Sequence, residues 1–481
     1  MNVLFTHSYF LHFDVKQLQQ SKPYPPLATL VAASYIRANG YEVYFHDVLF
    51  EKSGEAILSS LEKIKPDVLV IYDDGFNYLT KMCLTNMRHA AQQMTSFAKE
   101  CGIKVIISSS DSTDHYQDYL QKGADVILLG EAEDSLAEVL HKWKHKEAIT
   151  DVAGIATLLN GSIKKNDRRL VRTDLDALPF AAWDLLDITP YKASWKKHGY
   201  FSINMATTRG CPFKCNWCAK PIYGNRYNTR SPELVVEELA LMYKLFQFDH
   251  VWFSDDIFGL KPRWVQSFNK VLQQTGLKFS FKIQMRADLL LKDDTIKNLA
   301  ESGCDEVWIG AESGSQKILD AMDKGTLVEQ IYDATNMMKA FGIKPCFFLQ
   351  LGYLGEEKED IDHTLKMLFD LMPYDIGVSV SYPLPGTGFY EKVKEQLTQK
   401  ANWTDSDELL LMYKGTFTPA YYKSLHRYIH KKFRGRQALT EIKKIIIFNS
   451  VQFKKALSYF YFAPASMVEL FKLRSLQATD Q

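Results

Sequence analysis

The stretch GCPFKCNWC, residues 210–218, is the part of this 481-residue chain that says most about its fold. It holds Cys211, Cys215 and Cys218, three of only seven cysteines in the whole sequence. Thiolates are soft ligands for zinc and for iron–sulfur clusters, so the close spacing predicts a shared metal group. Because no fourth cysteine or histidine lies nearby, one metal position is expected to stay open.

Structural zinc and disulfides are the alternatives for these cysteines. Structural zinc takes four protein ligands in tetrahedral geometry. The next histidine is His250, and Cys304 and Cys346 lie far downstream, so a closed site would need an untypical spacing. Disulfides are less favoured still, because a chain of this length can bury a core without them.

The pattern Cys-x-x-x-Cys-x-aromatic-Cys resembles the signature of radical S-adenosylmethionine (SAM) enzymes. In that family three thiolates hold a [4Fe-4S] cluster, and the fourth iron binds the amino and carboxylate groups of SAM. The resemblance implies that Cys211, Cys215 and Cys218 are the cluster ligands and that Trp217 packs near the adenine. An electron from the cluster would cleave SAM to methionine and a deoxyadenosyl radical, which abstracts hydrogen from a substrate.

Length and composition describe a globular protein of two or three domains. The net charge of +1, with 24% charged residues, predicts no overall attraction to polyanions. No apolar run reaches the roughly 18 residues of a membrane-spanning helix, and the first ten residues lack the pattern of a signal peptide. The cytoplasm is therefore the expected location, and its reducing conditions would keep thiolates free.

Residues 1–145 alternate short apolar strands with helices, which predicts a parallel, doubly wound, Rossmann-like sheet. The expected strands are Asn2–Thr6, Glu42–Phe45, Asp67–Ile71, Lys104–Ser108 and Asp125–Leu128. The expected helices are Leu27–Asn39, Glu55–Ile64 and Leu79–Glu100. Ligands of such sheets bind beyond the carboxyl ends of the strands. The residues at those ends are His7–Phe10, Asp73–Asn77, Ser108–Thr113 and Gly130–Glu133.

This segment resembles the cobalamin-binding domain that precedes the radical SAM domain in one large subgroup of these enzymes. No GxGxxG follows the first strand, so a dinucleotide site has little support. The matching stretches are PPL at 25–27, PDV at 66–68 and LGEAE at 129–133. The resemblance implies cobalamin as a further cofactor, with Ser109, Gly130 and Glu131 among its contacts.

Two features depart from that subgroup. The chain has no Asp-x-His-x-x-Gly motif to supply an axial histidine, and most members of the subgroup lack it too. Residues Ser108–Asp111 stand where the subgroup usually has a pair of glycines, and side chains there narrow the approach of a ligand to the backbone. A domain of this fold without a cofactor is the alternative.

Residues 146–200 are expected to form a linker, with strands at Gly154–Leu159 and Ile163–Lys165. From 201 to 400 the alternation resumes, which predicts a partial (β/α)6 barrel, the fold that the resemblance also implies. A helix is expected to start with Ser231 as its N-cap and Pro232 at its first position. The expected strands are Phe201–Thr207, His250–Phe253, Phe279–Gln284, Glu306–Gly310, Pro345–Leu351 and Ile376–Ser381.

Polar residues follow the expected barrel strands, where a barrel site should lie. The resemblance implies that Asp255 and Asp256 accept from the SAM amino group, with helix capping as the alternative. Arg286 matches a position that can hold the SAM carboxylate. Glu312 and Ser313 match a motif near SAM, where a glutamate can accept from ribose hydroxyls or from the ammonium.

Residues 401–481 are expected to form a helical extension. From residue 421 to the end, 8 Lys and 4 Arg stand against 2 Glu and 1 Asp, a net charge of +9. A helical cap on the barrel with a solvated basic face is favoured. Peripheral contact with anionic lipid is the alternative. Nucleic acid comes third, because the methylthiolating tRNA enzymes have three further cluster cysteines near the N-terminus, where this chain has only Cys83 and Cys101.

The sequence therefore predicts a radical SAM enzyme that modifies an unactivated carbon of a small-molecule substrate, with cobalamin, by methylation or cyclisation. Its architecture resembles that of the anaerobic magnesium-protoporphyrin monomethyl ester cyclase. A ferredoxin or flavodoxin is the expected electron donor, and no side chain is singled out as catalytic. Two alternatives stay open: a radical SAM enzyme with an empty N-terminal domain, and a non-catalytic metal-binding scaffold with a zinc site.

Overall fold

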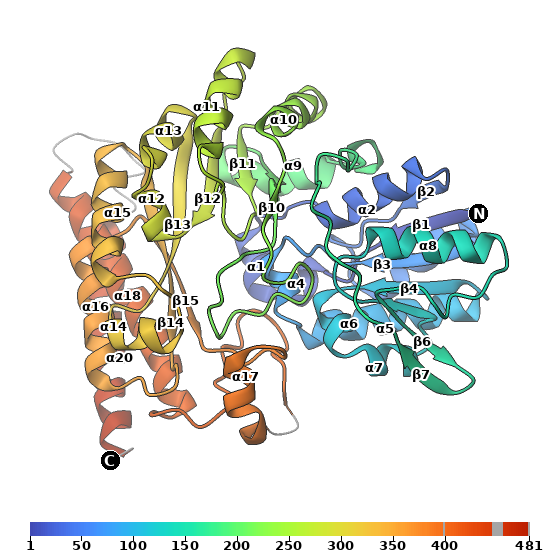
Figure 1. Ribbon diagram of the computed structural model, residues 1–481. Helices are drawn as coiled ribbons and strands as arrows, with labels where there is room; N and C mark the ends of the chain where they lie inside the picture. The colour runs from blue at the N-terminus through green and yellow to red at the C-terminus, as the bar shows by residue number, and fades with distance from the viewer. Residues whose placement is uncertain (398–399, 445–455, 480–481) are drawn as a thin grey trace.

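Two sheets form the centre of the molecule and lie side by side, each with its own helices (Figure 1). The computed structural model describes residues 1–397, 400–444 and 456–479. The first sheet belongs to the N-terminal part of the chain, and the C-terminal helices lie on the far side of the second sheet. None of the helices in the described part of the chain combines the length and apolarity that a membrane crossing needs.

The first sheet has the strand order β2-β1-β3-β4-β5-β6-β7. Its first five strands are parallel, as predicted, and β1, β3, β4 and β5 are largely buried because helices cover both faces, whereas the edge strand β2 is only partly buried. The last two strands form an antiparallel hairpin that extends the sheet from β5. The strands are β1 (Asn2–Thr6), β2 (Glu42–Phe45), β3 (Val68–Tyr72), β4 (Lys104–Ser108), β5 (Val126–Leu128), β6 (Ile155–Leu159) and β7 (Ser162–Lys165).

The three helices expected around this sheet are present, with one correction. The segment expected as a single helix over 79–100 is two helices, because Cys83 has φ 55° and the Thr85 N–H donates to the Trp403 carbonyl instead of to a preceding turn. The helices are α1 (Val15–Gln20), α2 (Leu27–Ala38), α3 (Ile57–Ile64), α4 (Tyr78–Lys81), α5 (Thr85–Glu100), α6 (Ser110–Asp114), α7 (Tyr116–Gln121), α8 (Glu133–Lys144) and α9 (Thr189–Trp195). Of these, α1, α6, α7, α8 and α9 were not predicted.

The second sheet is an open, all-parallel half-barrel with the order β15-β14-β13-β12-β11-β8, which confirms the predicted architecture. Its strands are β8 (Ser202–Met205), β11 (His250–Phe253), β12 (Ser280–Met285), β13 (Cys304–Glu312), β14 (Lys344–Leu351) and β15 (Asp375–Val380). Its helices are α10 (Pro232–Phe246), α11 (Trp264–Thr275), α12 (Ala287–Leu290), α13 (Thr295–Glu301), α14 (Gln316–Ala321), α15 (Val328–Ala340), α16 (Lys358–Leu371) and α17 (Gly388–Val393). Helix α10 begins as predicted, with the Ser231 side chain accepting from the Leu234 N–H.

The two faces of the half-barrel differ in chemistry. In β12, Phe281 and Ile283 have no exposed surface and pack toward the helices, whereas Lys282 and Gln284 alternate with them and keep accessible surface. The Lys282 ammonium lies 5.2 Å from the ring centre of Tyr24, a residue of the N-terminal part of the chain. The concave face of the half-barrel therefore looks toward the first sheet.

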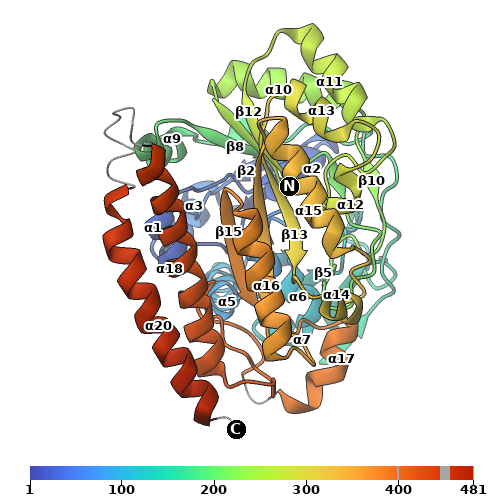
Figure 2. The ribbon, with the colours of Figure 1, turned by 90° about the vertical axis from the view of Figure 1, so that its left-hand side faces the viewer.

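The C-terminal extension is helical, as predicted. Helix α18 (Pro419–Lys444) buries Tyr422, Leu425 and Phe433 beside the half-barrel, and α20 (Tyr459–Thr479) runs alongside α18 on the outside (Figure 2). The extension thus caps one flank of the half-barrel.

Candidate functional site

The cysteine loop lies at the C-terminal end of the half-barrel strands. It follows β8 and the short β9 (Thr208–Arg209), which pairs with β10 (Asn228–Thr229). Cys211 is buried, Cys215 and Cys218 are partly buried, and all three thiols are free. Gly210 has φ 80°, and a Cβ there would lie 2.4 Å from the Arg226 carbonyl oxygen, so the entry to the loop requires glycine.

The three thiols do not form a site for a single ion. In the described residues, no set of three or more cysteine, histidine or carboxylate side chains converges on one ion position. An iron–sulfur cluster takes its thiolates on separate irons, so it does not need them to converge on one point. Free cysteines grouped on one loop are a donor set that suits such a cluster.

Asp255 shapes the chain before the cysteine loop. Its Oδ1 accepts from the Thr207 and Thr208 backbone N–H groups at 2.8 and 2.6 Å, and both threonine hydroxyls also donate to its carboxylate. The carboxylate is almost fully buried, and burial raises the pKa of Asp255 to about 6. With four donors already bound, Asp255 organises the turn that leads into the loop.

Asp256 faces the opposite way, toward the first sheet. Its Oδ1 lies 2.6 Å from the Nζ of Lys81, which comes from α4. These two side chains line a small pocket together with Gly210 and Ala219, the residues that flank the three cysteines. The Asp256 carboxylate and the Lys81 ammonium, which come from different parts of the chain, therefore meet beside the cysteine loop.

The Arg286 guanidinium already binds other groups of the protein. Its guanidinium donates to Asp288 at 2.8 Å and to the carbonyls of Lys324 and Gly325 at 2.7 and 2.9 Å. It also lies over the ring of Phe213 in the cysteine loop, 3.9 Å from the ring centre. Arg286 thus ties the cysteine loop to the loop after α14.

Glu312 and Ser313 lie at the end of β13. Glu312 pairs with Lys324 at 2.7 Å, and the Lys324 ammonium stands 6.0 Å from the ring centre of Trp217. The Trp217 indole nitrogen is buried and has no hydrogen-bond partner in the part of the chain that the structure describes. The Ser313 hydroxyl contacts Thr364 on α16, away from the cysteines. Trp217 therefore offers an open donor to a ligand beside the cysteine loop, and Ser313 offers none.

A buried ion-pair cluster joins the two sheets next to the cysteines. Arg209 in β9 pairs with Glu131 and, at 2.6 Å, with Glu133 from the end of the first sheet. Its guanidinium also lies 5.3 Å from the ring centre of Tyr223, which stacks on Phe76 with ring centres 5.5 Å apart. Sequence reasoning did not single out Arg209, although two acidic residues in LGEAE and an arginine directly before Gly-Cys carry complementary charge.

The residues expected to contact cobalamin all bind other parts of the chain. Ser109 is the N-cap of α6, with its hydroxyl accepting from the Ser112 N–H at 2.8 Å. Gly130 lies so close to the carbonyl of Ile222 that a Cβ there would be 3.3 Å away. Glu131 pairs with Arg209. The space that remains between segment 219–223 and the first sheet holds roughly one water molecule. A corrin ring therefore does not fit there while segment 219–223 lies as it does in this structure.

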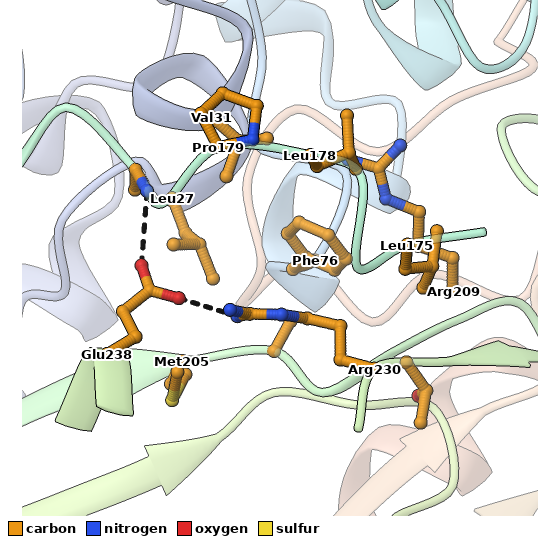
Figure 3. Close-up of a pocket in the computed structure, with 13 residues that line it drawn as sticks. Leu27, Val31, Phe76, Leu175, Leu178, Pro179, Met205, Arg209, Arg230 and Glu238 are labelled. Carbon is orange, nitrogen blue, oxygen red and sulfur yellow. Dashed lines mark hydrogen bonds and ion pairs between the residues drawn. The ribbon is translucent and has the colours of Figure 1, made fainter. Parts of the chain in front are cut away.

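Another pocket lies between α2, the connecting segment 175–181 and β9 (Figure 3). Its walls are mostly apolar, and its three charged residues are all paired. Glu238 pairs with Arg230 at 2.5 Å and accepts from the Ala181 N–H, and Arg209 pairs with Glu131 and Glu133. We assign it to the packing of the connecting segment against the two sheets.

The half-barrel and its site match a known family. Residues 205–368 match the model of the radical SAM superfamily, so this part of the chain is a radical SAM domain. The superfamily uses a [4Fe-4S] cluster and SAM.

Individual proteins are similar to this one over most of its length. It is 25% identical to an uncharacterised methyltransferase of Pyrococcus horikoshii, over 79% of this chain and 81% of that protein. It is 24% identical to the anaerobic magnesium-protoporphyrin IX monomethyl ester cyclase of Rubrivivax gelatinosus, over 82% of this chain and 71% of the cyclase. Among solved structures, the cobalamin-dependent radical SAM enzyme OxsB with bound aqua-cobalamin has the same fold, with a TM-score of 0.73, 18% identity, and coverage of 97% of this chain and 72% of OxsB.

Proposed function

We propose that this protein cleaves SAM reductively at a [4Fe-4S] cluster held by Cys211, Cys215 and Cys218 and modifies an unactivated carbon of a small molecule. The observation that carries the proposal is the position of three free cysteines on one loop, at the strand ends of a radical SAM domain. When bound, the cluster and SAM supply a deoxyadenosyl radical that takes a hydrogen atom from the substrate. A ferredoxin or flavodoxin is the proposed electron donor.

The protein's own residues would place SAM around the loop. Trp217 offers an unpaired indole donor, and the Glu312–Lys324 pair supplies charges of both signs beside its ring. Asp255 and Arg286 act indirectly, because one holds the turn before the loop and the other holds Phe213 within it. Fixed surroundings of this kind keep a reactive species in one orientation.

The concave face of the half-barrel is the proposed place for the substrate. On β12, β13 and β14 several of its side chains, among them Lys282, Trp308 and Phe348, are polar or aromatic and keep accessible surface, while those of the opposite face are buried. Trp308 and Phe348 stack there with ring centres 4.7 Å apart, and Lys282 lies 5.1 Å from the ring centre of Trp252. Aromatic rings with few polar groups are typical linings of small-molecule sites.

Methylation and cyclisation are the two proposed outcomes, because the relatives are named for a methyltransferase and a cyclase. Cobalamin is the further cofactor proposed from the relatives and the fold. A second candidate, a radical SAM enzyme without a corrinoid, is favoured by the packing of segment 219–223 on the first sheet. Protein purified from cobalamin-supplied cells distinguishes them, since only the first candidate retains a stoichiometric corrinoid absorption spectrum.

Contact with anionic lipid remains a proposal for the C-terminal extension. Helix α20 exposes Phe460 and Phe471 at 71% and 64%, on one side of the helix, with exposed Lys472 and Arg474 nearby. Sedimentation with phosphatidylglycerol vesicles tests it: binding that is lost in a Phe460→Ser, Phe471→Ser variant supports the contact. Equal sedimentation with neutral phosphatidylcholine vesicles would contradict it.

Anaerobic reconstitution with iron and sulfide tests the proposed enzyme. The expected product contains about four iron and four sulfide per chain, binds SAM, and releases deoxyadenosine and methionine once a strong reductant is added. Zinc without iron and sulfide would instead support the metal-binding scaffold.

A further inference from the structure

Lys282, on the concave face of the half-barrel, is a cation without an ion-pair partner in the described part of the chain. Its ammonium forms no hydrogen bond there either, and it lies over two rings, 5.2 Å from the centre of Tyr24 and 5.1 Å from that of Trp252. Burial lowers the pKa of Lys282 from its ordinary value, and the nearby Glu306 opposes this change. The protein therefore compensates the charge of Lys282 only in part.

Three carboxylates lie on the strands beside Lys282, and two of them already have partners. Asp305 on β13 and Asp375 on β15 are held by a lysine and an arginine, at 2.9 and 2.6 Å respectively. Glu306 on β13 is the neighbour of Lys282 in the strand register, but no ion pair joins these two side chains in the described residues. Glu306 is thus the one carboxylate among the three that could partly balance this lysine.

Two further groups indicate that positive charge is in excess around Lys282. Burial and the nearby Lys282 lower the pKa of Lys22, which forms no ion pair with the residues that the structure describes. Burial also lowers the pKa of His250 to about 3, and Lys282, Lys22 and Lys344 add to this effect. The His250 ring is therefore neutral at pH 7, and its surroundings favour an anion.

Aromatic rings from both parts of the chain surround Lys282. Tyr78 on α4 is 49% exposed, although its ring centre lies only 6.4 Å from that of Trp252 on β11. The ring centre of Tyr24 lies 4.7 Å from that of Trp252. We call Lys282, Tyr24, Tyr78 and Trp252 the Lys282 patch. Its rings suit an apolar body, and its ammonium suits a negative charge on that body.

We propose that the Lys282 patch binds a carboxylate of the substrate, and that the substrate is an apolar or aromatic carboxylic acid. The lysine donates to the carboxylate in a hydrogen bond between charged groups. One ammonium beside Glu306 suits the single charge of a carboxylate better than the two charges of a phosphate. This inference rests on the proposed function and goes beyond it by naming the class of substrate.

The Lys282 patch lies apart from the cysteine loop. Strand β12 leads from Lys282 to Arg286, whose guanidinium lies 3.9 Å from the ring centre of Phe213 in that loop. Four residues of strand span about 13 Å. The carboxylate of the substrate is therefore expected on the order of 10 Å from the carbon that reacts beside the loop.

The test uses two probes that share a ring system and differ in charge, 1-naphthylacetate and 1-naphthylacetamide. The full chain, purified anaerobically, is titrated calorimetrically with each probe at pH 7. Wild type is expected to bind the acetate about tenfold more tightly than the acetamide, the effect of a hydrogen bond between charged groups. Lys282→Met should raise the Kd of the acetate about tenfold and leave that of the acetamide within about twofold.

Glu306→Gln should have the opposite effect, because it removes a negative charge beside the ammonium. We expect it to lower the Kd of the acetate about twofold or more and to leave that of the acetamide unchanged. This variant decides the question if Lys282→Met does not fold. Lys63→Met on α3 removes an exposed lysine as a control and should change neither Kd.

Wild type that shows no preference for the acetate would overturn the inference, as would an equal loss of both probes in Lys282→Met. The proposed function is tested separately, by the cluster and the deoxyadenosine that wild type forms. A chain that prefers the acetate but forms neither would overturn the proposed function, and with it the assignment of the Lys282 patch to a substrate.

Discussion

Asp255 and Asp256 are neighbours in sequence but have different surroundings, so we expect their substitutions to affect stability differently. Removing the Asp255 carboxylate leaves the Thr207 and Thr208 donors unpaired inside the protein. We expect Asp255→Ala to lower the free energy of unfolding by about 3 kcal/mol. Asp256→Asn breaks only the partly exposed ion pair with Lys81, so it should change the free energy of unfolding by less than about 1 kcal/mol. Urea unfolding of the cluster-free protein measures both, and equal losses would contradict this assignment.

At the residue scale, the sequence identified the cysteines but not the partners of the residues near them. The cysteine spacing is local, so it is visible without a structure. The partners are not local: Lys81 lies 175 positions from Asp256 and Glu131 lies 78 positions from Arg209. Which charge meets which depends on how the two sheets are packed, and a motif carries no information about that.

The turn after β14 contains a buried carboxyl that should make stability depend on pH. Glu356 has no exposed surface, accepts from the Gly352 N–H at 2.6 Å, and burial raises its pKa to about 8. Between about pH 4.5 and 8 the folded protein keeps this proton and the unfolded chain loses it. Stability from this group therefore falls as pH rises, by about 1.4 kcal/mol per unit.

Glu356→Gln removes that titration. We expect the free energy of unfolding of Glu356→Gln, minus that of wild type, to increase between pH 5 and pH 8 in urea titrations. Because the same buffers are used for both proteins, the titration of other groups cancels. A difference that stays constant over this range would show that Glu356 is ionised in the folded protein.

At the element scale, the strands of both sheets were predictable because buried apolar runs alternate regularly with helical segments. The break between α4 and α5 could not be predicted, because residues 79–100 contain no proline or glycine to mark it. The break depends on the left-handed backbone of Cys83 and on a hydrogen bond to the distant Trp403. Its consequence is the position of Lys81 beside the cysteine loop.

At the scale of the whole molecule, Arg209 should contribute strongly to holding the two sheets together. Arg209→Met leaves Glu131 and Glu133 without their counter-charge in a buried place. We expect a loss of about 3–5 kcal/mol in the free energy of unfolding, and faster proteolysis between the two sheets. Arg230→Met, which breaks a pair with Glu238 on α10 of the half-barrel, is a matched control for the proteolysis. Unchanged proteolysis of Arg209→Met would contradict this role.

The overall architecture could be predicted from sequence patterns, whereas the packing between the two sheets could not. The motif LGEAE matches a cobalamin-binding domain, but the structure uses its glutamates to bind Arg209 and places Ile222 against its glycine. The serine-rich stretch at 108–111 was the visible sign of this difference, since it forms a capped helix where glycines were expected. The contact with 219–223 involves long-range packing, which residue patterns do not encode.

The role of the cysteine loop is tested most directly by anaerobic reconstitution of wild type beside a variant with Cys211, Cys215 and Cys218 all changed to alanine. Iron content, the electron paramagnetic resonance signal after reduction, and deoxyadenosine formed from SAM are measured for both. We expect a cluster and deoxyadenosine for wild type, and neither for the variant, with the circular dichroism of the cluster-free proteins unchanged. A variant that still assembles the same cluster and still cleaves SAM would contradict it.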